Sequence, residues 1–320
     1  MRRREFIMLA GTAAAWPVVA RAPTYPARPV HIIVGYGAGG SNDIFARLIG
    51  QWLSERLHQP FIIENRPGAG TNIATEAVVA AAPDGYTLLM ANPANAINAT
   101  LYKRLEFVFL RDIVPVVRMI RQPLIMMVNP LVPAKTVSEF IDYAKANPGK
   151  INMASAGIGS INHLTGELFK MMTGISAVQV PYRGAGPALT DLLGGQADLL
   201  FGGMASSIDH VKAGKLRALA VTTAKRSEAL PDIPAVSEFV PGYEASDWFG
   251  LGTPKGTPAE IIDILDNEVN AGLADPRLTA RISDLGGTVF PGSSADFGKL
   301  IADETEKWAK VINFAGIKAV

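Results

Sequence analysis

Short apolar runs alternate with longer amphipathic stretches along most of the chain, which is the pattern of a mixed α/β protein. In the stretch 41–57 the apolar residues Ile44, Leu48 and Trp52 recur at every fourth position, which predicts a helix with one face on a sheet. The same reasoning predicts helices at 73–82, 137–146, 162–173, 187–193 and 259–274, and a C-terminal helix ending near residue 314. Predicted strands fall at 30–34, at 61–64, within 83–92, and at 124–129, 151–154, 178–181, 198–202, 218–222 and 248–254.

A chain of 320 residues exceeds one ordinary hydrophobic core, so we predict two lobes. The order of the elements indicates where they divide. A new α/β unit begins with the strand at 124–129, and the chain from residue 248 onward returns to the first unit. We therefore predict one lobe formed by residues 23–123 and 246–320, and a second lobe formed by residues 124–245.

Composition and charge exclude several classes of protein. Hydrophobic residues make up 48% of the chain and charged residues 18%, which predicts a compact globular protein. The formal net charge of +1 lacks the basic excess of a nucleic-acid binder. The absence of cysteine excludes disulfides, thiolate metal sites and cysteine nucleophiles, and the four histidines lack metal-ligand spacing. We expect no metal and no cofactor.

The N-terminus has the pattern of an export signal. Three arginines precede the apolar run 6–20, which is too short to span a bilayer but fits a signal peptide. Residues 3–7 resemble the twin-arginine address for export of folded proteins, and an ordinary secretory signal fits equally well. An A-x-A sequence at 20–22 predicts a signal of residues 1–22 and a periplasmic mature protein.

Three glycine-rich loops lead from predicted strands into predicted helices: "GYGAGGSND" (35–43), "ASAGIGSINH" (154–163) and "PYRGAGP" (181–187). Such loops present backbone N–H groups at the positive end of a helix dipole, so each is suited to an anion. Glycine lets the ligand approach those N–H groups closely. Ser41 and Ser160 stand where we expect the N-caps of two of these helices.

Two enzymatic interpretations of the loops fit less well. The G-x-G-x-x-G of 35–40 resembles a dinucleotide-binding loop, but Asp43 would lie close to a pyrophosphate, and an exported protein meets little reduced nicotinamide. Ser160 and His163 lie three residues apart, yet "IGSIN" lacks the second glycine of a nucleophile elbow. An exported hydrolase remains the less favoured alternative.

Several segments in order resemble the Bug (Bordetella uptake gene) family, the extracytoplasmic solute-binding receptors of tripartite tricarboxylate transporters. They are "PVHIIVGYGAGGSNDIFAR", "IIENRPGAGTNIATEAVVAAAPDGYTLL", "MASAGIGSINHLTGELF", "VPYRGAGPALTDLLGGQADLLF", "GKLRALAVTTAKRSEALPDIPAVSE" and "GTPKGTPAEIIDIL". The resemblance runs from about residue 25 to the C-terminus. It implies a type II periplasmic-binding-protein fold, with two α/β lobes joined by crossing hinge strands, and a protein that is not an enzyme.

The resemblance also implies a ligand, partners and a site. The ligand is a small carboxylate, such as a di- or tricarboxylate, an acidic amino acid or an aromatic acid, which a monomer holds between its lobes. The partners are the membrane subunits of the transporter; a sensor kinase is the alternative. The positions that match the family's binding loops are Ala38, Gly39, Gly40, Asp43, Asn92, Ser155, Gly157, Gly159, Ser160, His163, Tyr182, Arg183 and Gly184.

One departure from the family bears on the ligand. Where the family commonly has Asp or Asn after a strand, this chain has "FGGM" at 201–204. We expect the loss of a polar contact there, a roomier and more apolar cleft, and an aromatic or otherwise bulky acid as ligand. We expect Asp43 to act indirectly, through a bridging water or by orienting the backbone, rather than to bind a carboxylate directly, because like charges repel.

Overall fold

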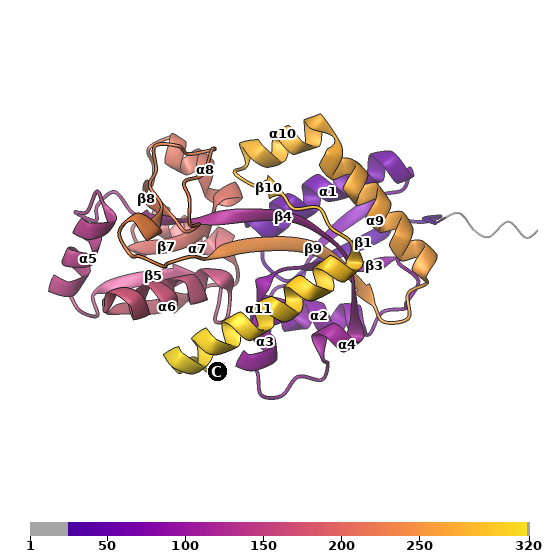
Figure 1. Ribbon diagram of the computed structural model, residues 1–320, viewed down its shortest axis with the longest axis horizontal. Helices are drawn as coiled ribbons and strands as arrows, with labels where there is room; N and C mark the ends of the chain where they lie inside the picture. The colour runs from indigo at the N-terminus through magenta and orange to yellow at the C-terminus, as the bar shows by residue number, and fades with distance from the viewer. Residues whose placement is uncertain (1–24, 319–320) are drawn as a thin grey trace, which may run out of the picture.

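Two sheets share one long strand in the computed structural model, which describes residues 25–318 (Figure 1). The first sheet has the order β2 (Phe61–Asn65), β1 (Val30–Val34), β3 (Thr87–Ala91), β9 (Ser246–Pro254) and β4 (Ile113–Val128), with β10 (Thr288–Val289) also on β4. The second sheet joins β6 (Ala177–Pro181), β5 (Ile151–Ser155), β7 (Leu199–Gly203) and β8 (Arg217–Val221) to the far end of β4. We call the elements around the first sheet lobe 1 and those around the second sheet lobe 2.

Parallel pairing governs the part of each sheet that leads into the glycine-rich loops. β1 pairs in parallel with β2 and β3, and β5 pairs in parallel with β6 and β7. These strands are short and apolar, as expected where helices cover a sheet. β4 and β9 run antiparallel to each other and connect the lobes side by side (Figure 1). The carboxyl ends of β1, β3, β5 and β7 therefore face the space between the lobes.

Helices cover both sheets. Lobe 1 has α1 (Ser41–Leu57), α2 (Asn72–Val79), α3 (Pro93–Leu101), α4 (Phe109–Asp112), α9 (Ala259–Ala274), α10 (Pro276–Asp284) and the 3₁₀ turn Ala69–Thr71. Lobe 2 has α5 (Val137–Ala146), α6 (Ile161–Thr173), α7 (Ala185–Leu193), α8 (Met204–Lys212) and the 3₁₀ turn Val236–Glu238. The predicted helix 41–57 is confirmed, and its buried side chains Phe45, Ile49 and Leu53 pack in the core of lobe 1.

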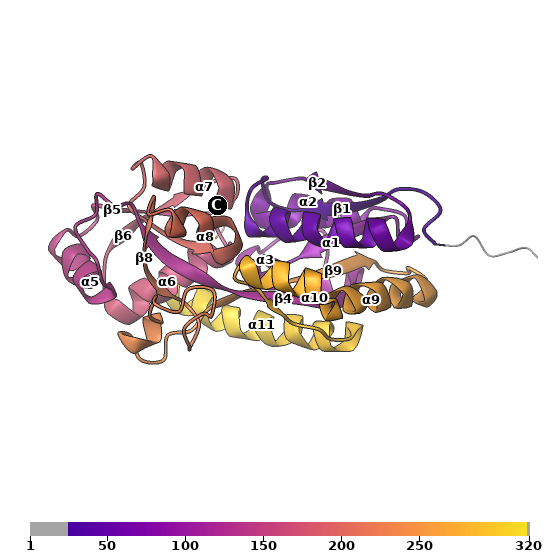
Figure 2. The ribbon, with the colours of Figure 1, turned by 90° about the horizontal axis from the view of Figure 1, so that it is seen from above.

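The C-terminal helix α11 (Ser294–Ala315) contacts the cores of both lobes. Phe297 and Ile301 pack with Trp248 in lobe 1, whereas Trp308 and Ile312 belong to a cluster formed mainly by lobe 2, with Ile97 and Leu101 of α3. In Figure 2, α11 runs along one side of the crossing strands, and α7 and α1 lie on the opposite side. The helix thus bridges the crossing strands on the side opposite α1 and α7 (Figure 2).

Proline accounts for two differences from the predicted elements. The predicted strand 124–129 is the far end of β4, which begins at Ile113 and includes Pro115 and Pro123. Pro115 lies at a shift in the β4–β9 register, and Pro123 pairs with Ser246 at the end of β9, where a missing N–H is tolerated. The sequence did not predict helix α3. Pro93 is its first residue, a position that suits proline because the missing N–H has no partner within the helix there.

The predicted lobe boundaries are compatible with β4 passing between the lobes, and they stay a prediction. The predicted signal of residues 1–22 lies outside the described residues. Within residues 25–318, no helix is long and apolar enough to cross a membrane.

The bridging role of α11 makes its buried tryptophan important for stability. Trp308 is fully buried, and its indole N–H donates to Glu304 Oε2 at 2.7 Å. We expect Trp308→Ala to lower the free energy of unfolding by about 3–5 kcal/mol through lost burial and a residual cavity. Urea denaturation, followed by circular dichroism, measures this change in the free energy of unfolding. Leu131→Ala is the control, because Leu131 is 86% exposed and should change stability by less than about 0.5 kcal/mol.

Candidate ligand-binding site

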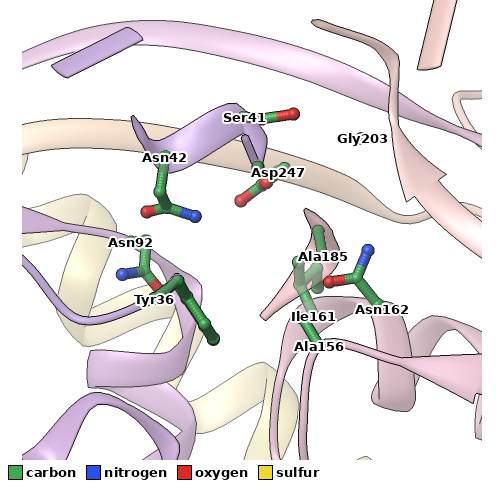
Figure 3. Close-up of a pocket in the computed structure, with 11 residues that line it drawn as sticks. Tyr36, Ser41, Asn42, Asn92, Ala156, Ile161, Asn162, Ala185, Gly203 and Asp247 are labelled. Atoms are coloured by element: carbon green, nitrogen blue, oxygen red, sulfur yellow. The ribbon is translucent and has the colours of Figure 1, made fainter. Parts of the chain in front are cut away.

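A small cavity lies where the two lobes meet the crossing strands (Figure 3). Lobe 1, lobe 2 and β9 all contribute to its wall, which consists of Tyr36, Gly40, Ser41, Asn42, Asn92, Ala156, Ile161, Asn162, Ala185, Gly203 and Asp247. Its volume is about 20 Å³, which is room for about one water molecule. The lobes are therefore closed around it.

The N-termini of five helices converge on the cavity. The N-caps of α1, α3 and α8 are Gly40, Asn92 and Gly203, and all three line the wall. The first residues of α6 and α7, Ile161 and Ala185, line it as well. Because the partial positive charge of each helix lies at its N-terminus, the cavity is a favourable place for an anion.

Three polar side chains of the wall hold buried atoms that have no hydrogen-bond partner within the described residues. They are Ser41 Oγ, Asn42 Oδ1 and Asn92 Nδ2. Buried polar atoms in proteins are nearly always paired, so such a cluster indicates a place for a ligand or for water. Ser41 was expected to cap α1, but Gly40 is the N-cap, which leaves the serine hydroxyl within the first turn.

Asp247 is the acidic group of the cavity wall. It is 4% exposed, its Oδ1 accepts from the Trp248 amide at 3.0 Å, and its Oδ2 accepts from Gln122 Nε2 at 3.4 Å. Burial raises the pKa of Asp247 to about 7, and the negative charge of Glu304 contributes to this increase. The two hydrogen bonds lower the pKa but do not outweigh burial. Sequence reasoning missed Asp247, although it is an acid within the apolar stretch "ASDWFGLGTP".

The predicted residues of the first loop have three different environments. Gly40 lines the cavity, whereas Ala38 and Gly39 border a separate open groove beside α7. Asp43 points back into its own loop, where it accepts from the Gly39 amide at 3.1 Å and pairs with Arg47 at 2.8 Å. Burial opposes its ionisation, but these bonds outweigh burial and lower the pKa of Asp43. Asp43 therefore holds the loop in shape, as its charge led us to expect.

The predicted residues of the second loop bond mainly to one another. Ser160 caps α6 by accepting from the His163 amide at 3.2 Å, and its hydroxyl donates to the Gly157 carbonyl at 2.7 Å. The Gly159 amide donates to His163 Nδ1 at 3.1 Å, so the ring proton lies on Nε2, 3.6 Å from Glu167 Oε1. The serine hydroxyl is thus not bonded to the imidazole ring, and the pair lacks the geometry of an activated nucleophile.

The remaining predicted residues lie at or near the contact between the lobes. The Gly37 amide donates to the Arg183 carbonyl at 3.3 Å, and Gly184 packs beside Gly37. The Arg183 side chain is exposed, and the Tyr182 hydroxyl donates to Asp191 Oδ2 at 2.7 Å. Burial, and to a smaller extent the hydrogen bond and negative charge of Asp191, raise the pKa of Tyr182 to about 12.

Ser155 and Gly157 lie at the carboxyl end of β5, beside a larger groove. Ser155 accepts from the Gly157 amide at 3.3 Å and also contacts Gln179. Gly157, Tyr182 and Arg183 border a larger groove of about 580 Å³, which also includes Tyr36 of the cavity wall. Of the predicted residues, Gly40 and Asn92 line the cavity itself, and the others shape the loops or the contact between the lobes.

The region of Gly203 differs from the expectation of a roomier, more apolar cleft. A β-carbon at Gly203 would collide with Ser41 Oγ and lie 2.8 Å from Gln122 Nε2. The space left by the absent side chain is therefore filled by two polar groups of lobe 1 and β4. Asn162, which the sequence also did not single out, donates to the Phe201 carbonyl at 2.6 Å and fixes the start of α6 on β7.

The family of the protein follows from its similarity to known proteins. The family of tripartite tricarboxylate transporter receptors (TctC) matches residues 45–317, so the chain belongs to this family of solute-binding receptors. The protein BugT of Bordetella pertussis is 37% identical over 98% of this chain and 96% of its own. These matches confirm the resemblance to the Bug family.

Two solved structures confirm the fold. Rpa4515 of R. palustris with adipate is 37% identical, with a TM-score of 0.90 over 92% of this chain and 100% of its own. MatC of Rhodopseudomonas palustris with bound malate is 30% identical, with a TM-score of 0.86 over 90% of this chain and 100% of its own. The fold is therefore that of the periplasmic binding proteins of this family, as predicted.

The raised pKa of Asp247 predicts a pH-dependent stability. The pKa rises from 3.8 to about 7 on folding, so the folded state retains the proton between these values and stability falls as the pH rises through that window. We expect Asp247→Asn to be more stable than the wild type at pH 8, by roughly 2–4 kcal/mol, and equal to it near pH 4. Urea denaturation at both pH values measures this. A difference that does not change with pH would contradict the assignment.

Proposed function

We propose that the protein binds a small carboxylic acid in the cavity between its lobes and delivers it, from the periplasm, to the membrane subunits of a tripartite tricarboxylate-type transporter. The observation that carries the proposal is the convergence of five helix N-termini on a buried cavity whose wall holds unpaired polar atoms. Adipate in Rpa4515 and malate in MatC support a carboxylate as the ligand.

The available interactions are strong enough for micromolar binding without a metal or a cationic side chain. Each hydrogen bond from a protein donor to a carboxylate contributes roughly 1.5–3 kcal/mol, and a helix N-terminus adds about 0.3–2 kcal/mol. A dissociation constant near 1 μM corresponds to about −8 kcal/mol, so several such bonds, made from both lobes, are needed to offset the ordering of ligand and lobes.

Ligand entry requires the lobes to separate. A cavity of about 20 Å³ is too small for any organic acid, and the lobes touch where Gly37 donates to the Arg183 carbonyl. We infer that the protein opens by bending where β4 and β9 cross between the lobes, and that the ligand stabilises the closed form by contacts with both lobes. The closed form is then the form that the transporter subunits receive.

The predicted export signal and the family together support a periplasmic location. The hydrogen bonds of Ser160 and His163 give no support to the hydrolase alternative.

Isothermal titration calorimetry of residues 23–320 against a panel of mono-, di- and tricarboxylates, acidic amino acids and aromatic acids tests the function. We expect at least one acid to bind with a dissociation constant of about 1 μM or tighter, because the site provides several donors and helix termini. The methyl ester or amide of that acid should bind at least tenfold more weakly. Equal affinity for acid and amide would contradict the assignment of a carboxylate site.

Gly186 offers a test of closure that leaves the fold intact. It lies in α7, and an added β-carbon would meet the Ala38 carbonyl oxygen of the opposite lobe at 2.5 Å. We expect Gly186→Ala to weaken binding of the acid identified above at least tenfold, because the closed form is strained while alanine is favourable in the helix.

Gly298→Ala is the matched control for closure. Gly298 lies in α11, and an added β-carbon would have Pro115 Cγ as its nearest neighbour, at an ordinary 3.8 Å. This variant should bind as the wild type does. Unchanged affinity of Gly186→Ala, with normal thermal stability, would show that binding does not require the lobe contact seen in this structure.

A further inference from the structure

We propose that Asp247 recognises a hydrogen-bond donor on the ligand, so that this receptor selects carboxylic acids with a hydroxyl or ammonium group near the carboxylate. The inference rests on the proposed function, because it concerns the same cavity. The expected ligand is then a small carboxylic acid that carries a hydrogen-bond donor, rather than any small acid.

The position of Asp247 leaves part of its carboxylate available to the cavity. Asp247 lies opposite Gln122 in the β4–β9 ladder and lines the cavity wall (Figure 3). Its two oxygens each accept one protein hydrogen bond, from the Trp248 amide at 3.0 Å and from Gln122 Nε2 at 3.4 Å. A carboxylate has about four acceptor positions, so roughly two remain for a ligand.

The side chain of Gln122 is fixed in the orientation that supports an ionised carboxylate. Its Oε1 accepts from the Ala205 amide at 3.1 Å, near the start of α8, and this leaves its Nε2 as the end that faces Asp247. Both protein groups bonded to Asp247 are therefore donors. At pH 8, above the raised pKa of Asp247, the carboxylate is ionised and can accept a hydrogen bond from a ligand donor.

No side chain of the cavity wall supplies a positive charge to Asp247. The eleven lining residues include no Lys, Arg or His, and the titratable neighbours of Asp247 are Tyr36 in the wall and the acidic Glu304 on α11. A buried carboxylate without a cation or a full set of donors is costly. A hydroxyl or ammonium group of the ligand would supply the missing donor when the lobes close.

The cavity wall thus offers a ligand two kinds of partner. The N-termini of five helices favour its carboxylate, while Asp247 on the crossing strand favours a hydrogen-bond donor. A plain acid gives Asp247 no donor. An acid with a nearby hydroxyl or ammonium group can use both kinds of partner.

Ligand families that differ at one carbon test the proposal. Succinate, malate and aspartate carry hydrogen, hydroxyl and ammonium on one skeleton, and phenylacetate, mandelate and phenylglycine do the same on an aromatic one. At pH 8 we expect calorimetry on the wild type to show at least tenfold tighter binding of the hydroxyl or ammonium member than of the plain acid, in each skeleton that binds. The two donor-bearing members then show whether the donor is neutral or charged.

Asp247→Asn should remove most of this preference. We expect the ratio between donor-bearing and plain acid to fall to about threefold or less, while the plain acid binds as well as before or better. Asp275→Asn is the matched control, because Asp275 caps α10 away from the cavity and asparagine caps equally well. It should keep the wild-type ratio. If Asp247→Asn does not fold, the ratio of wild-type affinities for donor-bearing and plain acids tests the proposal by itself.

The outcomes separate this inference from the proposed function. If plain acids bind the wild type as tightly as their donor-bearing partners, or if Asp247→Asn keeps the preference, the donor assignment is wrong and the carboxylate site stands. Uptake of a proton when a plain acid binds, measured in buffers of different ionisation enthalpy, would show Asp247 acting as a neutral donor and would also overturn the inference. Failure of every acid in the broad panel would overturn the proposed function itself.

Discussion

The antiparallel pairing of β4 with β9 is the interaction on which the rest of the molecule depends. It runs from Ile113 opposite Pro254 to Pro123 opposite Ser246, and β4 then continues into the second sheet. Because both strands pass between the lobes, the ladder joins the two sheets. It also places Gln122 and Asp247 opposite each other where the lobes meet. The hinge and the floor of the cavity are therefore one piece of structure.

This arrangement explains why a buried acid is compatible with a stable fold. Asp247 loses hydration when it is enclosed, and hydrogen bonds from Trp248 and Gln122 offset only part of that loss. The remainder destabilises the folded protein at a pH above the raised pKa of Asp247. A receptor benefits from such a penalty, because lobes that closed tightly without ligand would gain little from binding one. The cost of burying Asp247 would then also make closure depend on a ligand that offers this carboxylate a donor.

Sequence patterns predicted the repeating parts of the fold and the loops of the site, but not their convergence. Helix 41–57 and strand 30–34 were found because their periodicity is local and strong. Helix α3 and the first part of β4 were missed; α3 begins with Pro93, and β4 contains Pro115 and Pro123, so prolines interrupt the local pattern of both elements. The glycine-rich loops are contiguous in sequence and were recognised. Asp247 reaches the cavity through strand pairing between distant segments, which no local pattern encodes.

The bridging helix α11 has a consequence for how affinity is set. Its N-terminal part packs in the core of lobe 1 and its C-terminal part packs mainly with lobe 2. If the lobes part at the cavity, the apolar contacts of this helix must change. The free energy of opening then depends on residues such as Trp308, which does not line the cavity. Relatives with the same cavity wall and a different helix at this position would then differ in affinity.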